Sequence, residues 1–147
     1  MTVRTAREDD LEEIGEVDAS LVLHPRRLER LRAAIARGQL LVAEADGHVA
    51  GLMDYHDLFF GHTFVALVVV HPQQRRRRIA TRLLDEAAAR ARTDRLFVST
   101  VASHPIMHTL LEKRGFVRCG AVGQIDPGET EVFYVRLLGD ASTASPP

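Results

Sequence analysis

Four consecutive arginines, Arg75–Arg78, separate a run of apolar residues from the start of a predicted helix. The first turn of a helix leaves backbone N–H groups without intrahelical partners, and their dipoles favour an anion in front of the helix. A phosphate group suits this position, and guanidinium groups add charge-assisted hydrogen bonds to its oxygens. The residue types and their order therefore predict a phosphate-binding turn. The alternative is a basic turn that only faces water, because charge runs usually do so.

Histidines are the side chains best suited to proton transfer near neutral pH. His62 directly follows Gly61 at the start of a predicted strand, and His104 and His108 share one face of a predicted helix. We expect His62 to accept a proton and His108 to supply one. The structural alternatives are a loop histidine at position 62 and a partly buried histidine at position 108. No carboxylate or cysteine cluster completes a zinc site around the His104–His108 pair, so we predict no bound metal.

The spacing of apolar residues and the turn residues predict alternating strands and helices. The predicted helices cover residues 9–17, 25–37, 79–92 and 105–114, and the predicted strands cover residues 2–7, 39–45, 48–57, 63–71, 95–101, 116–122 and 131–138. Asp46-Gly47 is a strong signal for a hairpin turn. The strand–helix–strand order over residues 63–101 predicts a parallel pair. We therefore predict an α/β fold with a mixed, mostly antiparallel sheet of six to seven strands and about four helices.

Length and composition narrow the class of protein. The 147 residues, 46% of them hydrophobic, suit one domain over residues 1–138, followed by a tail, residues 139–147, that we expect to lie in solvent. A formal net charge of -1 gives no general attraction to nucleic acid or to an anionic membrane, so we predict neither as a partner. The single cysteine, Cys119, and the lack of a long apolar segment near Met1 favour the cytoplasm.

The sequence around the arginine run resembles a known motif. From Val70 to Leu83 it reads V-x-P-x-x-R-x-x-R-x-A-x-x-L. This is similar to the acyl-CoA-binding signature V-x-P-x-x-[RQ]-x-x-G-x-[GA]-x-x-L of the GNAT family of N-acetyltransferases. Arg78 stands where that family has glycine. An arginine costs little backbone strain if residue 78 has right-handed helical dihedrals. We therefore interpret the motif as altered but competent to bind CoA.

A second segment supports the resemblance. Ser103–Phe116 ends in E-K-x-G-F and is similar to a later helix of this family that often reads N-x-x-A-x-x-L-Y-E-K-x-G-F. Leu111 stands where the family often has a tyrosine that acts as general acid toward the leaving thiolate, and leucine cannot donate a proton. Together with the strand order, the resemblance covers residues 1 to about 138.

The resemblance implies transfer of an acetyl group from acetyl-CoA, as co-substrate, to a primary amine of a small molecule or peptide. It also implies a set of CoA-binding residues on the fourth strand, the basic turn and the later helix. This set comprises Val68, Val69, Val70, Arg75, Arg76, Arg77, Arg78, Ile79, Ala80, Thr81 and His104.

The general base is left unassigned by the motifs. An amine with a pKa near ~10 must lose a proton before it attacks. Many relatives use a glutamate on the fourth strand, whereas residues 62–70 contain no carboxylate. We predict His62 as the base, with His56 and Asp57 as the other polar candidates. Further candidates for the acceptor site are Tyr134, Phe59 and Phe60 as lining residues and Arg26, Arg27 and Arg30 as contacts to an anionic substrate. The alternatives are core filling for the aromatic residues and a solvated helix face, which we favour, for the arginines.

Two other functions stay open at this point. A non-catalytic acyl-CoA-binding or regulatory module fits Arg78, Leu111 and a fourth strand without a carboxylate. A nucleic-acid-binding protein would use Arg75–Arg78 and would bind with a steep salt dependence, but the net charge argues against it. The sequence is compatible with a homodimer and does not indicate one, and it identifies neither the acceptor nor the acyl chain length.

Overall fold

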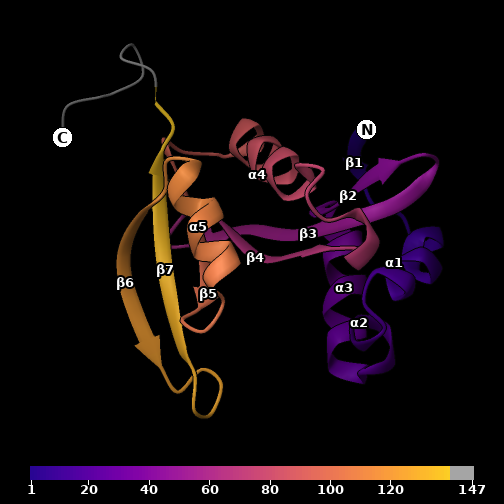
Figure 1. The fold of residues 1–147 in the computed structure, drawn as a ribbon, viewed down its shortest axis with the longest axis horizontal. Coiled ribbons are helices and arrows are strands. Elements are labelled where there is room, and N and C mark those ends of the chain that lie inside the picture. The colour runs from indigo at the N-terminus through magenta and orange to yellow at the C-terminus, as the bar shows by residue number, and fades with distance from the viewer. Residues whose placement is uncertain (140–147) are drawn as a thin grey trace. The chain divides into compact units, whose positions relative to one another are not determined.

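The strands form one seven-stranded sheet in the order β1-β2-β3-β4-β5-β7-β6 (Figure 1). The computed structural model describes residues 1–139, so the predicted tail, except Gly139, lies outside the described residues. The strands are β1 (Thr2–Thr5), β2 (Leu40–Ala45), β3 (His48–Phe59), β4 (His62–Val70), β5 (Arg95–Val101), β6 (Val117–Gly123) and β7 (Thr130–Leu137). The helices are α1 (Leu11–Val17), α2 (Ser20–Leu23), α3 (Pro25–Arg37), α4 (Ile79–Arg90) and α5 (Pro105–Lys113), with the 3-10 helices η1 (Glu8–Asp10) and η2 (Pro72–Gln74).

Most predicted elements are confirmed. Strand β5 has the predicted bounds, α3 begins at Pro25 and stops before Gly38, and β4 pairs with β5 in parallel. Antiparallel pairing joins β1 to β2, β2 to β3, β5 to β7 and β6 to β7, which confirms a mixed and mostly antiparallel sheet. Helix α2 is not among the predicted elements, because its four residues are too few to show a helical period.

The described chain divides into two compact units. The first contains Met1–His56 and Ala66–Glu86, and the second contains Asp57–Val65 and the residues from Ala87 on. Strands β3 and β4 and helix α4 contribute residues to both units.

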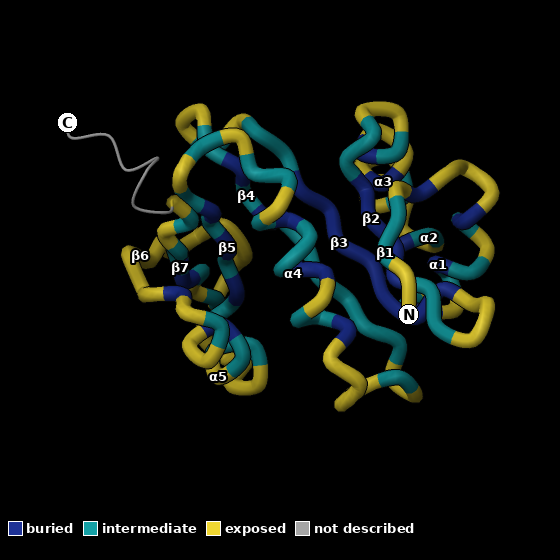
Figure 2. Tube along the Cα trace, turned by 90° about the horizontal axis from the view of Figure 1, so that it is seen from above, coloured by how far each residue is buried: buried dark blue, intermediate teal, exposed yellow. Residues whose placement is uncertain are grey.

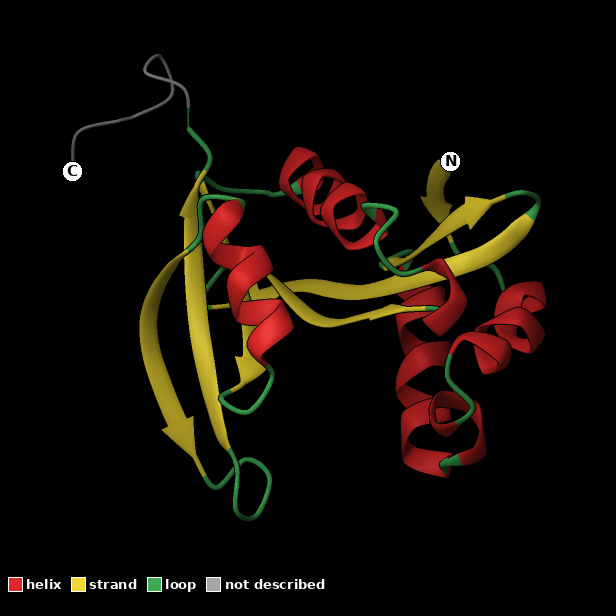
Figure 3. Cartoon of the chain, in the orientation of Figure 1, coloured by secondary structure: helices red, strands yellow, loops and turns green. Residues whose placement is uncertain are grey.

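In the first unit, helices α1, α2 and α3 cover one face of the strands and α4 lies on the other face (Figure 3). Strand β3 is buried along most of its length, as Figure 2 shows in dark blue. The core on the α1–α3 face consists of aliphatic side chains from these helices and from the strands. Its buried members are Ala6, Ile14, Val17, Leu21, Leu31, Ala34, Leu40, Val42, Val49 and Leu52.

Helix α4 approaches β3 closely at Gly51. A Cβ atom on Gly51 would lie 2.8 Å from Cγ2 of Ile79 and 3.1 Å from the carbonyl oxygen of Val69. The first distance is too short for a Cβ atom and the second is tighter than most Cβ contacts, so glycine lets the first turn of α4 lie directly on the strand. This contact holds the start of α4 next to the end of β4, where the basic turn lies.

In the second unit, α5 packs on the strands β5, β7 and β6. Alternate residues of β5, Leu96, Val98 and Thr100, are buried, because successive side chains of a strand point to opposite faces. Leu111 on α5 is fully buried as well. The opposite set of side chains forms an aromatic cluster in which the rings of Phe59, Phe64, Phe97 and Phe133 lie 4.9–5.9 Å apart.

The helices are short. Among residues 1–139, no helix is long and apolar enough to cross a membrane.

Candidate active site

The basic turn connects the end of β4 to the start of α4, and both lie in the first unit. The side chain of His71 accepts a hydrogen bond from the backbone N–H of Gln73, which stabilises the turn through η2. The carbonyl of Arg78 accepts from the N–H of Arg82 at 3.0 Å, which is the first helical bond of α4. The N–H groups of Ile79, Ala80 and Thr81 therefore belong to the first turn, where an anion is favoured.

The four arginines of the turn are all exposed but differ in their contacts. Arg77 donates to Gln74 Oε1 at 2.6 Å and lies 3.4 Å from a carboxylate oxygen of Asp46, in the β2–β3 turn. Within residues 1–139, Arg75, Arg76 and Arg78 make no ion pair. Three guanidinium groups are thus available to an anion, and the fourth is directed to the β2–β3 turn.

The backbone of the turn does not have the right-handed helical dihedral angles at residue 78 that would let an arginine fit there with little strain. Arg78 has a φ of 60° and Arg76 a φ of 67°, so residue 78 is left-handed rather than right-handed. In this region the Cβ atom crowds the backbone, at a cost of about 1–2 kcal/mol for a residue other than glycine. The condition under which an arginine at position 78 would cost little strain is therefore not met, and the glycine of the family motif has a conformational reason.

Replacing Arg78 by glycine is expected to raise the free energy of unfolding of the unliganded protein. The gain is about 0.5–1 kcal/mol, because the relief of left-handed strain exceeds the entropy that glycine adds to the unfolded chain. Urea denaturation measures it. Arg77→Gly is the matched control, since Arg77 does not have a positive φ, and this change should destabilise the protein. If Arg78→Gly loses as much stability as Arg77→Gly, residue 78 is not strained by its positive φ.

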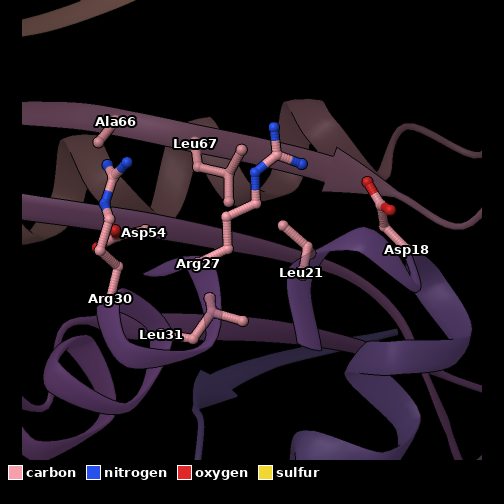
Figure 4. A pocket seen from close by; sticks show the side chains of 8 residues that line it. All are labelled: Asp18, Leu21, Arg27, Arg30, Leu31, Asp54, Ala66 and Leu67. Atoms are coloured by element: carbon pink, nitrogen blue, oxygen red, sulfur yellow. The ribbon is translucent and has the colours of Figure 1, made fainter. Parts of the chain in front are cut away.

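A pocket of about 230 Å³ lies in the first unit between helix α3, strand β4 and the start of α2 (Figure 4). Its charged residues are Asp18, Arg27, Arg30 and Asp54. Its apolar residues are Leu21, Leu31, Ala66 and Leu67. The mixture of apolar walls and a few converging charges is typical of a site for a small ligand.

Asp54 is the buried charge of this pocket. It lies on β3 and is 7% exposed. Within the described residues, the one hydrogen-bond donor to its carboxylate is Arg37 Nη2, at a long 3.4 Å. Burial raises the pKa of the Asp54 carboxyl, and the positive charges of Arg37, Arg30 and His56 oppose that rise. A buried carboxylate with a weak partner and a raised pKa is a group that readily takes up a proton.

Asp54 is absent from the residues predicted by sequence. The available signal was its position in the middle of an apolar strand, between Met53 and Tyr55. A single carboxylate in a buried strand needs a reason, because ionised groups are rarely buried without a partner.

The predicted site residues fall into both units. Val68, Val69, Val70 and the turn from Arg75 to Thr81 lie in the first unit, whereas His62, His104 and His108 lie in the second. His62 contacts Thr93 Oγ1 through Nδ1 at 2.6 Å, and its ring centroid lies 5.5 Å from that of Phe97. Its predicted role as base stays a prediction.

His108 is held by two hydrogen bonds. Nε2 lies 3.0 Å from the carbonyl oxygen of Val101 and Nδ1 lies 2.6 Å from the hydroxyl of Tyr134. A carbonyl only accepts, so Nε2 carries the proton and, in the neutral ring, Nδ1 accepts from the tyrosine. Burial raises the pKa of Tyr134, which keeps its hydroxyl protonated as a donor. The Tyr134–His108 pair links β7 to α5, and its predicted role in proton supply stays a prediction.

Two other sequence candidates, His104 and Asp57, have local partners. His104 caps α5, because its Nδ1 accepts from the N–H of Met107 at 3.4 Å. Asp57 accepts from Thr63 Oγ1 at 2.7 Å and lies 3.7 Å from Arg92 Nε. These contacts account for the positions of both side chains within the second unit.

Comparisons with known proteins agree with this arrangement. The sequence model of the acetyltransferase (GNAT) family matches residues 6–116, more than half of the chain. A comparison with curated proteins gave no match. Among solved structures, a GNAT-family acetyltransferase from Bacillus cereus is 29% identical, with a TM-score of 0.85 over 95% of this chain and 98% of that chain.

Two further structures show the likeness of fold alone. The ribosomal-protein-alanine N-acetyltransferase from Brucella melitensis is 22% identical, with a TM-score of 0.71 over 94% of this chain and 100% of that chain. The protein yncA from Salmonella typhimurium, solved with its cofactor acetyl-CoA, is 23% identical, with a TM-score of 0.69 over 99% of this chain and 97% of that chain. The match of the family model and the motifs around the basic turn together show that the chain belongs to the acetyltransferase (GNAT) family, whose enzymes use acetyl-CoA.

Proposed function

We propose that this protein transfers an acetyl group from acetyl-CoA to a primary amine of a small molecule or peptide in the cytoplasm. The observation that carries the proposal is the turn after β4, where three exposed arginines without ion pairs within residues 1–139 stand next to the first turn of α4. The pyrophosphate of CoA carries the charge and the oxygen acceptors that such a turn attracts.

The residues of the basic turn fit acetyl-CoA as the acetyl donor. Arg75, Arg76 and Arg78 supply side-chain donors, and the N–H groups of Ile79, Ala80 and Thr81 supply backbone donors at the positive end of the helix. By the family resemblance, the backbone of Val68–Val70, in the same unit, would hold the thioester carbonyl. The predicted contact of His104 with the pantetheine arm stays a prediction. Gly51 supports the arrangement, because it allows α4 to begin directly on the strand.

For the transfer to occur, the protein must remove a proton from the ammonium form of the acceptor and present the neutral amine to the thioester. Most of an amine with a pKa near ~10 is protonated at pH 7, so a base must act before or during the attack. The leaving thiolate has a pKa near ~8.5 and departs without an obligatory acid. This agrees with Leu111, which is fully buried and takes the position of the family's tyrosine.

Titration calorimetry with acetyl-CoA tests the first half of the proposal, with CoA and ATP as controls. We expect micromolar binding of acetyl-CoA and much weaker binding of ATP. A continuous assay of released thiol over a panel of primary amines tests the second half. Binding without turnover of any amine would favour a non-catalytic acyl-CoA-binding module, and no binding would mean that the left-handed Arg78 has disabled the turn.

A further inference from the structure

The pocket between α3 and β4 is placed for an acceptor substrate. It lies against Ala66 and Leu67, the residues of β4 that directly precede Val68–Val70. One strand of the first unit therefore runs from this pocket to the phosphate-binding turn. The volume of about 230 Å³ is below the usual range of about 300–1,000 Å³ for drug-sized ligands, so the pocket suits a small acceptor.

The charges of the pocket are not equally available. Asp18 accepts from the N–H and the hydroxyl of Ser20 at 2.9 and 2.7 Å, and Arg27 donates to the same hydroxyl at 2.8 Å. Arg30 makes no ion pair within the described residues. Asp54 has only the long contact to Arg37. The pocket thus offers one carboxylate and one guanidinium group to a ligand, and Arg27 lines it as a second cation (Figure 4).

We propose that this pocket binds a small primary amine that also carries an anionic group, with Asp54 as the general base and Arg30, assisted by Arg27, as the anion-binding residue. The proposal rests on the proposed acetyltransferase function. A buried carboxylate favours the ammonium end of such a substrate, and an exposed guanidinium favours a carboxylate or phosphonate end. A carboxylate and a guanidinium group that line the same pocket can together bind both charged ends of a small zwitterion.

The reaction balances with these groups. The ammonium form of the acceptor gives one proton to the Asp54 carboxylate, and the amine nitrogen then forms a bond to the acetyl carbonyl carbon. The C–S bond of the thioester breaks, its electron pair leaves on sulfur, and the thiolate takes a proton from water. The nitrogen and the protonated Asp54 each release a proton to solvent, so the products are an amide, a free thiol and one net proton, and Asp54 is again ionised.

The pH dependence follows from the surroundings of Asp54. Burial raises its pKa, while Arg37 and Arg30 of α3 and His56 of β3 lower it, and Asp18 and Arg27 complete the charges that line the pocket. Only ionised Asp54 accepts a proton, so kcat/KM should fall as the pH drops through this pKa. In Asp54→Asn, the residual kcat/KM should no longer show this fall at low pH.

The test uses the full-length protein, saturating acetyl-CoA, and α-amino acids paired with their α-amino amides, which differ by one negative charge. We expect kcat/KM to favour the carboxylate by at least about 10-fold, the size of one charge-assisted hydrogen bond. Arg30→Gln should reduce this ratio by about 10-fold. Arg26→Gln is the matched control, because Arg26 is exposed on the same helix and does not line the pocket.

Asp54→Asn should lower kcat at least about 100-fold for both members of each pair, while the Kd for acetyl-CoA stays unchanged. Its thermal midpoint should not fall at pH 7, since asparagine avoids the burial of a charge. Equal rates for acids and amides, or an Arg30→Gln effect equal to that of the control, would overturn the substrate class. Turnover retained in Asp54→Asn would overturn the base. If acetyl-CoA binds and no amine reacts, the proposed function fails as well.

Discussion

Replacing Arg75 and Arg78 together by glutamine is expected to weaken the binding of acetyl-CoA by about 100-fold. Each guanidinium that binds a phosphate oxygen contributes about 1.5 kcal/mol, and two such contacts amount to about 3 kcal/mol. Glutamine keeps most of the length of the side chain and removes the charge, and neither side chain has an internal ion pair within residues 1–139 to lose. Titration calorimetry with acetyl-CoA measures the effect.

Arg77→Gln is the matched control for this experiment. Arg77 belongs to the same turn but contacts Gln74 and Asp46, so its replacement should weaken acetyl-CoA by less than about 3-fold. Raising the salt concentration should reduce the difference between the variants, because the lost interactions are ionic. Equal losses for Arg77→Gln and for the double variant would contradict the assignment of Arg75 and Arg78 as the phosphate-binding side chains.

Replacing Asp10 by asparagine is expected to lower the free energy of unfolding at pH 7 by about 2–3 kcal/mol. Asp10 is 7% exposed and accepts from Arg4 Nη1 and Nη2 at 2.9 and 2.8 Å and from the N–H of Arg7 at 2.7 Å. Arg4 also donates to Glu44 at 2.7 Å, which ties β1 to β2. Loss of the Asp10 charge leaves a partly buried guanidinium with half of its counter-charge. Urea denaturation at pH 7 measures the change.

The same residue sets the acid limit of stability. Hydrogen bonds from Arg4 lower the pKa of Asp10 below its ordinary value. The stabilisation is therefore complete above the pKa of the unfolded chain, about 3.9, and is lost as the pH falls through the lower pKa of the folded protein. The difference between wild type and Asp10→Asn should shrink below about pH 4. Asp94→Asn is the control, because the Asp94–Arg95 pair is solvent-exposed and its loss should change stability little at any pH. A difference that persists unchanged at pH 2 would contradict this account of Asp10.

Local signals determined the secondary structure. Pro25 and Gly38 define the ends of α3, Asp46-Gly47 joins β2 to β3, and alternating residues identify β5 with its observed bounds. Each of these features depends on the φ preference of one or two residues or on a period of two, which a sequence displays directly. Helix α2 could not be predicted in this way, because a single helical turn shows no period in the sequence. Its position depends instead on the packing of Leu21.

The position of the basic turn was also accessible from sequence, since its arginines, the strand before it and the helix after it are neighbours in the chain. Its details were not. Asp46, 31 residues away, engages Arg77 and so separates it from the other three arginines. The left-handed φ of Arg78 follows from the path of the chain between β4 and α4.

The candidate acceptor pocket is a product of tertiary structure. Asp54 becomes a buried carboxylate beside Arg30 and Arg37 only when α3 packs on β3. Likewise, Tyr134 and His108 become a hydrogen-bonded pair only when α5 packs on β7, across 26 residues of sequence. The sequence by itself therefore determined the family, most of the elements and the position of the basic turn between β4 and α4, because those depend on short-range patterns. Only the tertiary structure decided which charge is buried, which arginine is engaged and which groups share a pocket, because burial and the distance between charges arise from contacts between residues far apart in the chain.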